Sequence, residues 1–173
     1  IGGEEVNSSP THSHHRYVIN FGERSEEECR REWPELFEIV ERKVKPGRLA
    51  QNREIRARYW WRFGETCPAL YAAISGFERV LVTGTAATTH LSFPYLSPSQ
   101  VFSHKLIVFP LQESHWFPCF KSHCHGVFAK AFSATLGDGL TYNPTNCFET
   151  FPFPTALLDS NSNDSVHIAT RYN

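Results

Sequence analysis

Residues 77–93 read FERVLVTGTAATTHLSF, and the expectations for the rest of the chain start from this segment. Two apolar runs, Val80–Val82 and Leu91–Phe93, carry β-branched or aromatic residues beside polar ones, a pattern that is typical of strands. Between them, Thr83–His90 is small, rich in hydroxyl groups and contains one glycine, which predicts a loop held by two strands. A plain surface hairpin with β-forming residues in its turn is the other interpretation.

The side chains of this loop suit the reading of base edges in a DNA groove. Hydroxyl groups form hydrogen bonds with several bases, and a threonine methyl group can contact the thymine methyl group. The candidate base-reading residues are Thr83, Thr85, Thr88, Thr89 and His90.

The composition indicates a folded, globular chain. Of 173 residues, 40% are hydrophobic and 14% aromatic, which argues for one ordinary core and against disorder. No run approaches the roughly 18 apolar residues of a membrane span, and the polar first 15 residues are not expected to act as a signal peptide. The chain begins with Ile and lacks Met, so we expect an excised piece of a longer protein, or a sequence that omits modified methionines.

The cysteines and histidines raise the question of a metal site. Five cysteines without a CxxC pair favour reduced intracellular thiols over a disulfide framework. Two clusters contain potential zinc ligands: His12, His14 and His15, and Cys119, His123, Cys124 and His125. The first has no cysteine or carboxylate at a matching spacing, and adjacent residues of a helix point about 100° apart. We therefore expect no metal ligands, and a zinc-dependent hydrolase stays a third hypothesis.

Charge is segregated along the chain, although the net charge is only −1. Residues 1–41 hold ten acids and four arginines, whereas residues 42–62 hold eight basic residues and one acid. Such a positive block is concentrated enough to contact DNA phosphates.

Part of this block is predicted to form a helix from about Leu49 to Phe63, with Ile55, Tyr59 and Phe63 in the core. Its arginines are either a solvated basic face or a row of guanidinium groups along a DNA backbone, which would supply salt-sensitive affinity. The candidate phosphate-binding residues are Arg53, Arg56, Arg58, Arg62 and Lys105.

Other patterns predict the remaining elements. The expected strands are Arg16–Phe21 and the central, most apolar Lys105–Phe109. The expected helices start at Ser25 with a capping box, at Pro34 with Leu36, Ile39, Val40 and Val44 buried, at Thr66–Pro68 with Gly76 as the closing residue, and at Ser114 with a break near Ser122–His123. Pro152 and Pro154 exclude a regular ladder, so Cys147–Pro154 must dock by its side chains. Together these elements predict one α+β domain with a mixed sheet and packed helices over residues 1–154, followed by a weakly ordered tail, 155–173.

Several of these segments together resemble the target recognition domain of MmeI-like (type IIG/IIL) restriction–modification enzymes. The matching stretches are Ile1–Asn7, His14–Ile19, Phe37–Val40, Val44–Pro46, Arg58–Arg62, Glu78–Val82, the strand ending at Phe109, and Phe148–Pro154. The closing FETFPFP after a Tyr-Asn-Pro turn is the most specific of them. Where relatives are expected to carry a more basic loop, this chain has Thr85-Ala-Ala-Thr-Thr.

The resemblance implies a specificity domain that binds double-stranded DNA for an adenine-specific methyltransferase. It implies a cytoplasmic, bacterial protein whose partners are DNA and the methyltransferase domain of the same chain, which takes up the flipped base. S-adenosylmethionine, and Mg²⁺ if a nuclease is present, would belong to the parent enzyme.

The motifs of catalysis are not found in this sequence. There is no Gly-rich turn for S-adenosylmethionine, no Asn/Asp-Pro-Pro-Tyr/Phe stretch and no paired acid–Lys nuclease site, so we expect no catalytic residue and no cofactor in this fragment. The Asn143–Pro144 pair lacks the second proline. The alternative function is a protein-interaction module of a defence complex that docks through the aromatic strip Phe148–Pro154.

Overall fold

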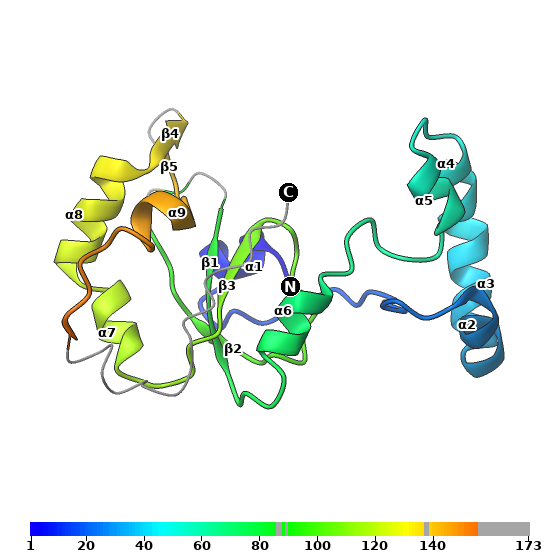
Figure 1. The fold of residues 1–173 in the computed structure, drawn as a ribbon, viewed down its shortest axis with the longest axis horizontal. Helices are drawn as coiled ribbons and strands as arrows, with labels where there is room; N and C mark the ends of the chain where they lie inside the picture. Colours follow the sequence, from blue (N-terminus) through cyan, green and yellow to red (C-terminus); the bar gives the residue numbers. More distant parts are fainter. Residues whose placement is uncertain (86–87, 89, 137–138, 156–173) are drawn as a thin grey trace. The chain divides into compact units, whose positions relative to one another are not determined.

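The computed structural model describes residues 1–85, 88, 90–136 and 139–155, with the backbone alone at 135–136. Contacts group the chain into two compact units, which we call the sheet unit (Ile1–Arg16 and residues from Ala69 on) and the helical unit (Tyr17–Pro68). Helices and an antiparallel sheet confirm the α+β class (Figure 1). Among the described residues, no helix has the length and apolar character required to cross a bilayer.

The helical unit is built from four short helices. They are α2 (Glu26–Glu32), α3 (Pro34–Lys43), α4 (Lys45–Leu49) and α5 (Glu54–Arg58). The capping box before α2 is confirmed: the Ser25 hydroxyl accepts a hydrogen bond from the Glu28 N–H at 3.2 Å, and the Glu28 carboxylate accepts one from the Ser25 N–H at 2.8 Å. Pro34 opens α3 in the first-turn position where its missing N–H costs nothing.

The core of the helical unit differs from the predicted one. Phe37 and Val40 are buried, but the expected core residues Leu36 and Ile39 are exposed. Helix α5 has only five residues, and Ile55 is 64% exposed. The backbone leaves the helix at Tyr59, so the four-residue spacing of Ile55, Tyr59 and Phe63 no longer places these side chains on one helix face.

Trp60 takes the core position instead, in edge-to-face contact with Phe37 at 5.3 Å between centroids. The indole offers more apolar surface for burial than Ile55. The expected strand Arg16–Phe21 is wrong for the described chain, because these residues pair with no strand there. Phe21 lies in the core of the helical unit, and Ile19 packs against that core.

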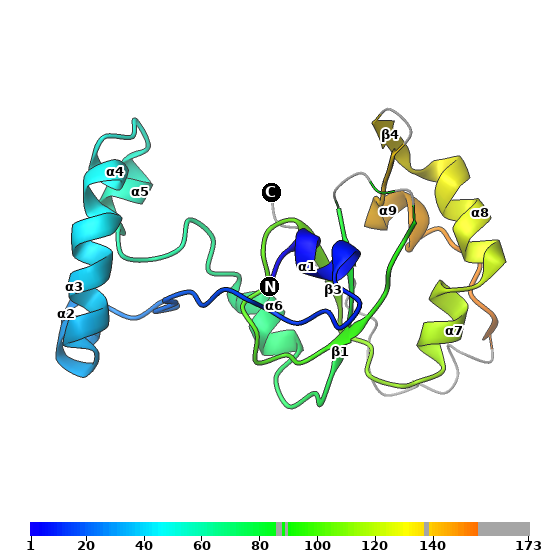
Figure 2. The same ribbon diagram turned by 180° about the vertical axis from the view of Figure 1, so that it is seen from behind.

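The sheet unit contains the remaining elements (Figures 1 and 2). They are α1 (Gly3–Ser8), α6 (Pro68–Ala73), β1 (Val80–Gly84), β2 (Tyr95–Leu96), β3 (Leu106–Phe109), α7 (Trp116–Phe120), α8 (His123–Phe132), β4 (Ala134–Leu136), β5 (Gly139–Thr141) and α9 (Pro144–Cys147). Gly76 follows α6 with φ +83°, which fits its expected role as the closing residue. The expected break in the 114–136 helix is confirmed, because Ser122 caps a new helix by accepting from the His125 N–H at 3.1 Å.

The sheet is antiparallel throughout the described residues, in the order β2–β1–β3, so the expectation of a mixed sheet is wrong. β1 rather than β3 is the central strand, although both are fully buried. β3 is apolar because both its faces are covered. An apolar sequence indicates such burial but does not show whether the strand lies at the centre or at the edge of the sheet. Leu91–Phe93 is not a strand, and the short β2 pairs with β1 on the side opposite β3. Pro94 in between has no N–H to extend the ladder.

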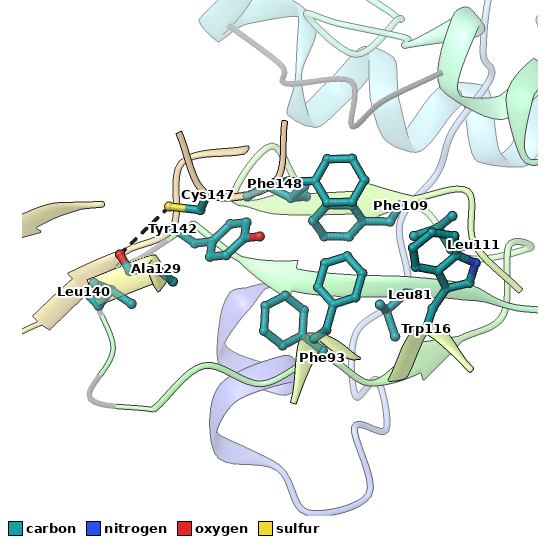
Figure 3. Packing of buried hydrophobic residues seen from close by; sticks show 12 residues of the cluster. Leu81, Phe93, Phe109, Leu111, Trp116, Ala129, Leu140, Tyr142, Cys147 and Phe148 are labelled. Atoms are coloured by element: carbon teal, nitrogen blue, oxygen red, sulfur yellow. Dashed lines mark hydrogen bonds between the residues drawn. The ribbon is translucent and has the colours of Figure 1, made fainter. Parts of the chain in front are cut away.

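Aromatic rings form the core beside this sheet (Figure 3). Phe120 lies 5.0 Å from both Phe93 and Phe109 between ring centroids, and Phe93 meets Tyr142 edge-to-face at 5.5 Å. Each buried ring of this size contributes about 1.5–3 kcal/mol through removal from water. These contacts join α7 to β3 and to the segments that carry Phe93 and Tyr142.

The strip Phe148–Pro154 docks by its side chains, as predicted. Phe148 is 4% exposed and stacks on Phe120 at 5.7 Å with 17° between the rings. Phe151 meets the His125 ring at 4.9 Å, and Phe153 meets Trp116 at 5.7 Å, both edge-to-face. Phe148 therefore belongs to the core of the sheet unit, and the half-buried Phe151 and Phe153 pack onto its aromatic rings.

Helix α1 carries a buried carboxylate, Glu5. It accepts hydrogen bonds from the Gly2 N–H at 3.0 Å and from Arg16 Nη2 at 2.7 Å. Burial acts to raise the pKa of Glu5, but the hydrogen bonds from Arg16 and the backbone outweigh it and hold the pKa at about 2.

We expect Glu5→Gln to lower the free energy of unfolding at pH 7 by about 1.5–3 kcal/mol, because a charged hydrogen-bond acceptor is lost. The folded-state pKa lies below the ordinary value of 4.5, so this stabilisation is present above about pH 4.5 and is lost as the pH falls toward 2. Urea denaturation at pH 7, 5, 4 and 3 measures it, with the exposed Glu4→Gln as the control. A wild-type advantage that is equally large at pH 7 and pH 3 would contradict the carboxylate–Arg16 interaction.

Candidate nucleic-acid interface

The predicted phosphate-binding arginines of the helical unit lie on and around α5. Arg53 precedes the helix and Arg58 ends it, and both side chains are exposed. Arg56 is half-buried beside Gly64, where an added Cβ would lie 3.4 Å from its Nε. Within the described chain, none of these three arginines forms an ion pair with a carboxylate. Their charges are thus available to an anion.

Arg62 is different, because its guanidinium is used inside the unit. Its Nε and Nη2 donate to the Arg24 carbonyl at 3.1 and 2.8 Å, and Nη2 also donates to the Glu23 carbonyl. The group lies 4.9 Å from the centre of the Tyr59 ring and 5.5 Å from that of Trp61. Arg62 holds two segments of the helical unit together, so we leave it out of the interface despite the sequence-based prediction.

Arg48 was not among the predicted residues, but it belongs to the same group of charges. Partial burial and then the like charge of Arg56 lower the pKa of Arg48. Its Nη2 lies 3.5 Å from the Arg62 carbonyl. Two guanidinium groups that repel each other in this way favour an anion next to them.

The loop after β1 is attached to the sheet unit at two points. Thr85 donates from its N–H and its hydroxyl to the Lys105 carbonyl, at 2.9 and 3.1 Å. Thr88 exchanges two backbone hydrogen bonds with Leu140, at 3.1 and 2.9 Å. The Thr88 hydroxyl donates to the His90 carbonyl at 2.9 Å, and the His90 side chain is exposed. Ala86, Ala87 and the predicted base-reading Thr89 lie outside the described residues.

Thr83 does not belong to this surface. It lies within β1 opposite Ile107, and its side chain is 1% exposed. Because strand side chains alternate, Thr83 shares the face of Leu81, which belongs to the aromatic core. Its side chain therefore faces the interior, so its prediction as a base-reading residue is wrong for this conformation. Lys105, in contrast, is exposed directly beside Thr85.

A pocket of about 200 Å³ lies on the sheet unit where the loop meets α8. Its lining includes His90, Leu91, Lys121, Ser122, Gly126 and Lys130. The two lysines are exposed, and the Lys121 ammonium donates to the Leu91 carbonyl at 3.1 Å. Sequence reasoning missed them, because lysines nine positions apart on either side of a helix break give no periodic signal. Only the contact between the loop and α8 brings them next to His90.

The cluster Cys119, His123, Cys124 and His125 has a structural role at His125. This side chain is fully buried, with Nδ1 3.0 Å from the Phe120 carbonyl and Nε2 3.1 Å from the Tyr142 hydroxyl. A carbonyl only accepts, so Nδ1 carries the proton and Nε2 accepts from Tyr142. Burial lowers the pKa of His125 in agreement with a neutral ring. Across the described part of the chain, no group of three or more potential ligands could hold a metal ion.

The chain matches no protein-family model, no curated protein and no solved structure. The anchored loop, the basic residues beside it and the arginines around α5 are therefore the observations from which a function is proposed.

Proposed function

We propose that this chain binds double-stranded DNA at a specific site, as the target recognition part of an adenine-specific DNA methyltransferase or restriction enzyme of the MmeI-like type. In this proposal the chain itself performs no catalysis. The methyltransferase domain of the same parent chain supplies S-adenosylmethionine binding, and a nuclease, where present, supplies Mg²⁺. The setting is the cytoplasm of a bacterium.

The observation that carries the proposal is the anchored loop of the sheet unit. Thr85 and Thr88 are held to the sheet unit by backbone hydrogen bonds, so these two positions of the loop are fixed. His90 is exposed, and the cations of Lys105, Lys121 and Lys130 lie around the same segment. Groups that can read bases beside groups that can bind phosphates are the combination that sequence-specific DNA binding requires.

The arginines around α5 support the same proposal on the helical unit. Arg53, Arg56 and Arg58 have no carboxylate partner in the described chain, and Arg48 repels Arg56. Phosphates would relieve this repulsion and would supply affinity that is independent of sequence. A solvated basic face would show the same exposure, so binding to DNA must decide between the two interpretations.

The test is a salt titration of the purified chain with a fluorescent random-sequence duplex, measured by anisotropy. We expect the association constant to fall steeply between 50 and 200 mM salt, because each released counterion adds about 0.9 to the slope. No binding at 50 mM salt, or binding that is insensitive to salt, would rule out the proposed function.

If the loop reads bases, a substitution in the loop should change the preferred base sequence and leave the affinity for random duplex unchanged. We expect Thr88→Ala to change the free-energy difference between the preferred base and the others by about 1–3 kcal/mol at one position of a randomised duplex library. The affinity for random duplex should stay within about twofold of the wild type. Thr88→Ser, which keeps the hydroxyl bond to the His90 carbonyl, separates loss of the methyl contact from loss of loop shape.

Thr150→Ala is the matched control, because the exposed Thr150 hydroxyl also donates to a backbone carbonyl, that of Asn146. Library selection followed by sequencing measures all three variants. An unchanged preference in Thr88→Ala would remove Thr88 from the base-reading set.

A further inference from the structure

The pocket between the loop and α8 has a lining in which positive charge dominates. Lys121 and Lys130 contribute ammonium groups and His90 an imidazole, and none of the residues that line it is acidic. Lys121 uses one N–H to donate to the Leu91 carbonyl at 3.1 Å, which holds the ammonium against the loop. An ammonium has three N–H donors, so two remain for a ligand.

The size of the pocket limits the ligand. About 200 Å³ is below the roughly 300–1,000 Å³ of pockets that enclose a drug-sized molecule. A volume of this size has room for a small anion such as one phosphate group together with a few waters.

Gly126 lines this pocket from inside α8 and leaves it without a side chain at that point. It lies inside α8, where glycine costs about 1 kcal/mol in helix stability relative to alanine. A Cβ added here would meet nothing within 4 Å, so packing in the fold does not explain the missing side chain. A methyl group at this position would project into open space along the pocket lining.

We propose that this pocket binds a phosphate group, with Lys121 and Lys130 as the charged ligands and Gly126 as the residue that leaves space for it. Ser122, the N-cap of α8, places the positive end of the helix dipole at the same pocket. The phosphate group can come from the DNA backbone or from free phosphate. The inference rests on the proposed function only if the phosphate belongs to DNA.

The experiment is a titration of the ¹⁵N-labelled full chain with inorganic phosphate at constant ionic strength, followed by amide chemical shifts. We expect saturable shifts at Lys121, Ser122 and Gly126. Lys121→Gln/Lys130→Gln should weaken binding at least tenfold, and the exposed Lys43→Gln of the helical unit should leave it unchanged. Gly126→Ala should weaken binding at least fivefold while raising Tm by about 2–4 °C, because alanine is the better helix former.

The second arm adds random duplex to the phosphate-loaded protein. Displacement of phosphate by duplex supports a backbone phosphate in the pocket. Duplex that binds without displacing phosphate, or does not bind at all, supports the free anion as the ligand, and the latter result also refutes the proposed function. The inference is overturned if phosphate shifts no amide of the pocket. It is also overturned if Gly126→Ala is more stable than the wild type and binds phosphate with the same affinity. Either result counts against the pocket even if the wild-type chain binds duplex.

Discussion

Phe148→Ala is expected to lower the free energy of unfolding by about 3–5 kcal/mol, the range for removing a buried phenylalanine. The ring is 4% exposed and touches three others, with centroid distances of 5.0 Å to Phe109, 5.7 Å to Phe120 and 5.2 Å to Phe153. These rings come from β3, α7 and the strip itself, so the cavity would open where three segments meet. Domains are stable by only about 5–15 kcal/mol, and this loss is a large part of that.

Guanidinium denaturation followed by far-UV circular dichroism measures the effect, with Phe132→Ala as the matched control. The Phe132 ring is 53% exposed, and its described aromatic neighbour is Phe128 on the same helix. We expect the control to cost less than about 1.5 kcal/mol.

The same pair of variants separates two roles of the strip Phe148–Pro154. A surface that docks a partner would tolerate Phe148→Ala with little loss of stability. A cost near that of the control would therefore restore the protein-interaction module as the better hypothesis.

Arg53→Ala/Arg58→Ala is expected to lower the salt dependence of duplex binding by about 1.8 in the slope of log K against log salt, since each phosphate contact contributes about 0.9. If Arg53, Arg56, Arg58 and Lys105 all contact phosphates, these four alone give a slope of about −3.6. A fourfold rise in salt then weakens the wild type about 150-fold and the double variant about 12-fold.

Arg31→Ala/Arg42→Ala is the control, because both arginines are exposed on the same unit outside the proposed interface. We expect it to leave the slope unchanged. Anisotropy titrations at 50, 100 and 200 mM salt give the slopes, and far-UV circular dichroism verifies that each variant is folded. An unaltered slope in the Arg53/Arg58 variant would remove α5 from the DNA interface and leave its arginines as a solvated face.

Local signals in the sequence predicted local structure well. The capping box at Ser25, the first-turn Pro34, the closing Gly76 and the new helix at Ser122 all act through groups within a few residues of each other. Such interactions are fixed by short-range geometry and do not depend on the rest of the fold. The docking of the FETFPFP strip followed equally directly, because two prolines exclude a ladder.

Predictions that needed long-range packing were less successful. Trp60 rather than Ile55 is buried in the helical unit, and the sequence pattern did not show that the chain leaves α5 at Tyr59. Thr83 looked like a loop residue because hydroxyl residues follow it, but its pairing with Ile107 extends β1 through it. Lys121 and Lys130 join the candidate site through a contact between segments some 30 residues apart, which no local pattern records.

The loop is attached to the sheet unit through main-chain atoms, and this bears on how a specificity of the proposed kind would change. The Thr85 N–H bond to Lys105 and the Thr88 exchange with Leu140 use groups that every residue except proline possesses. Replacing the side chains at these positions therefore leaves the anchoring main-chain bonds available. If the chain binds DNA as proposed, point substitutions in this one segment would change the target sequence, while the scaffold and the general affinity for DNA would be kept.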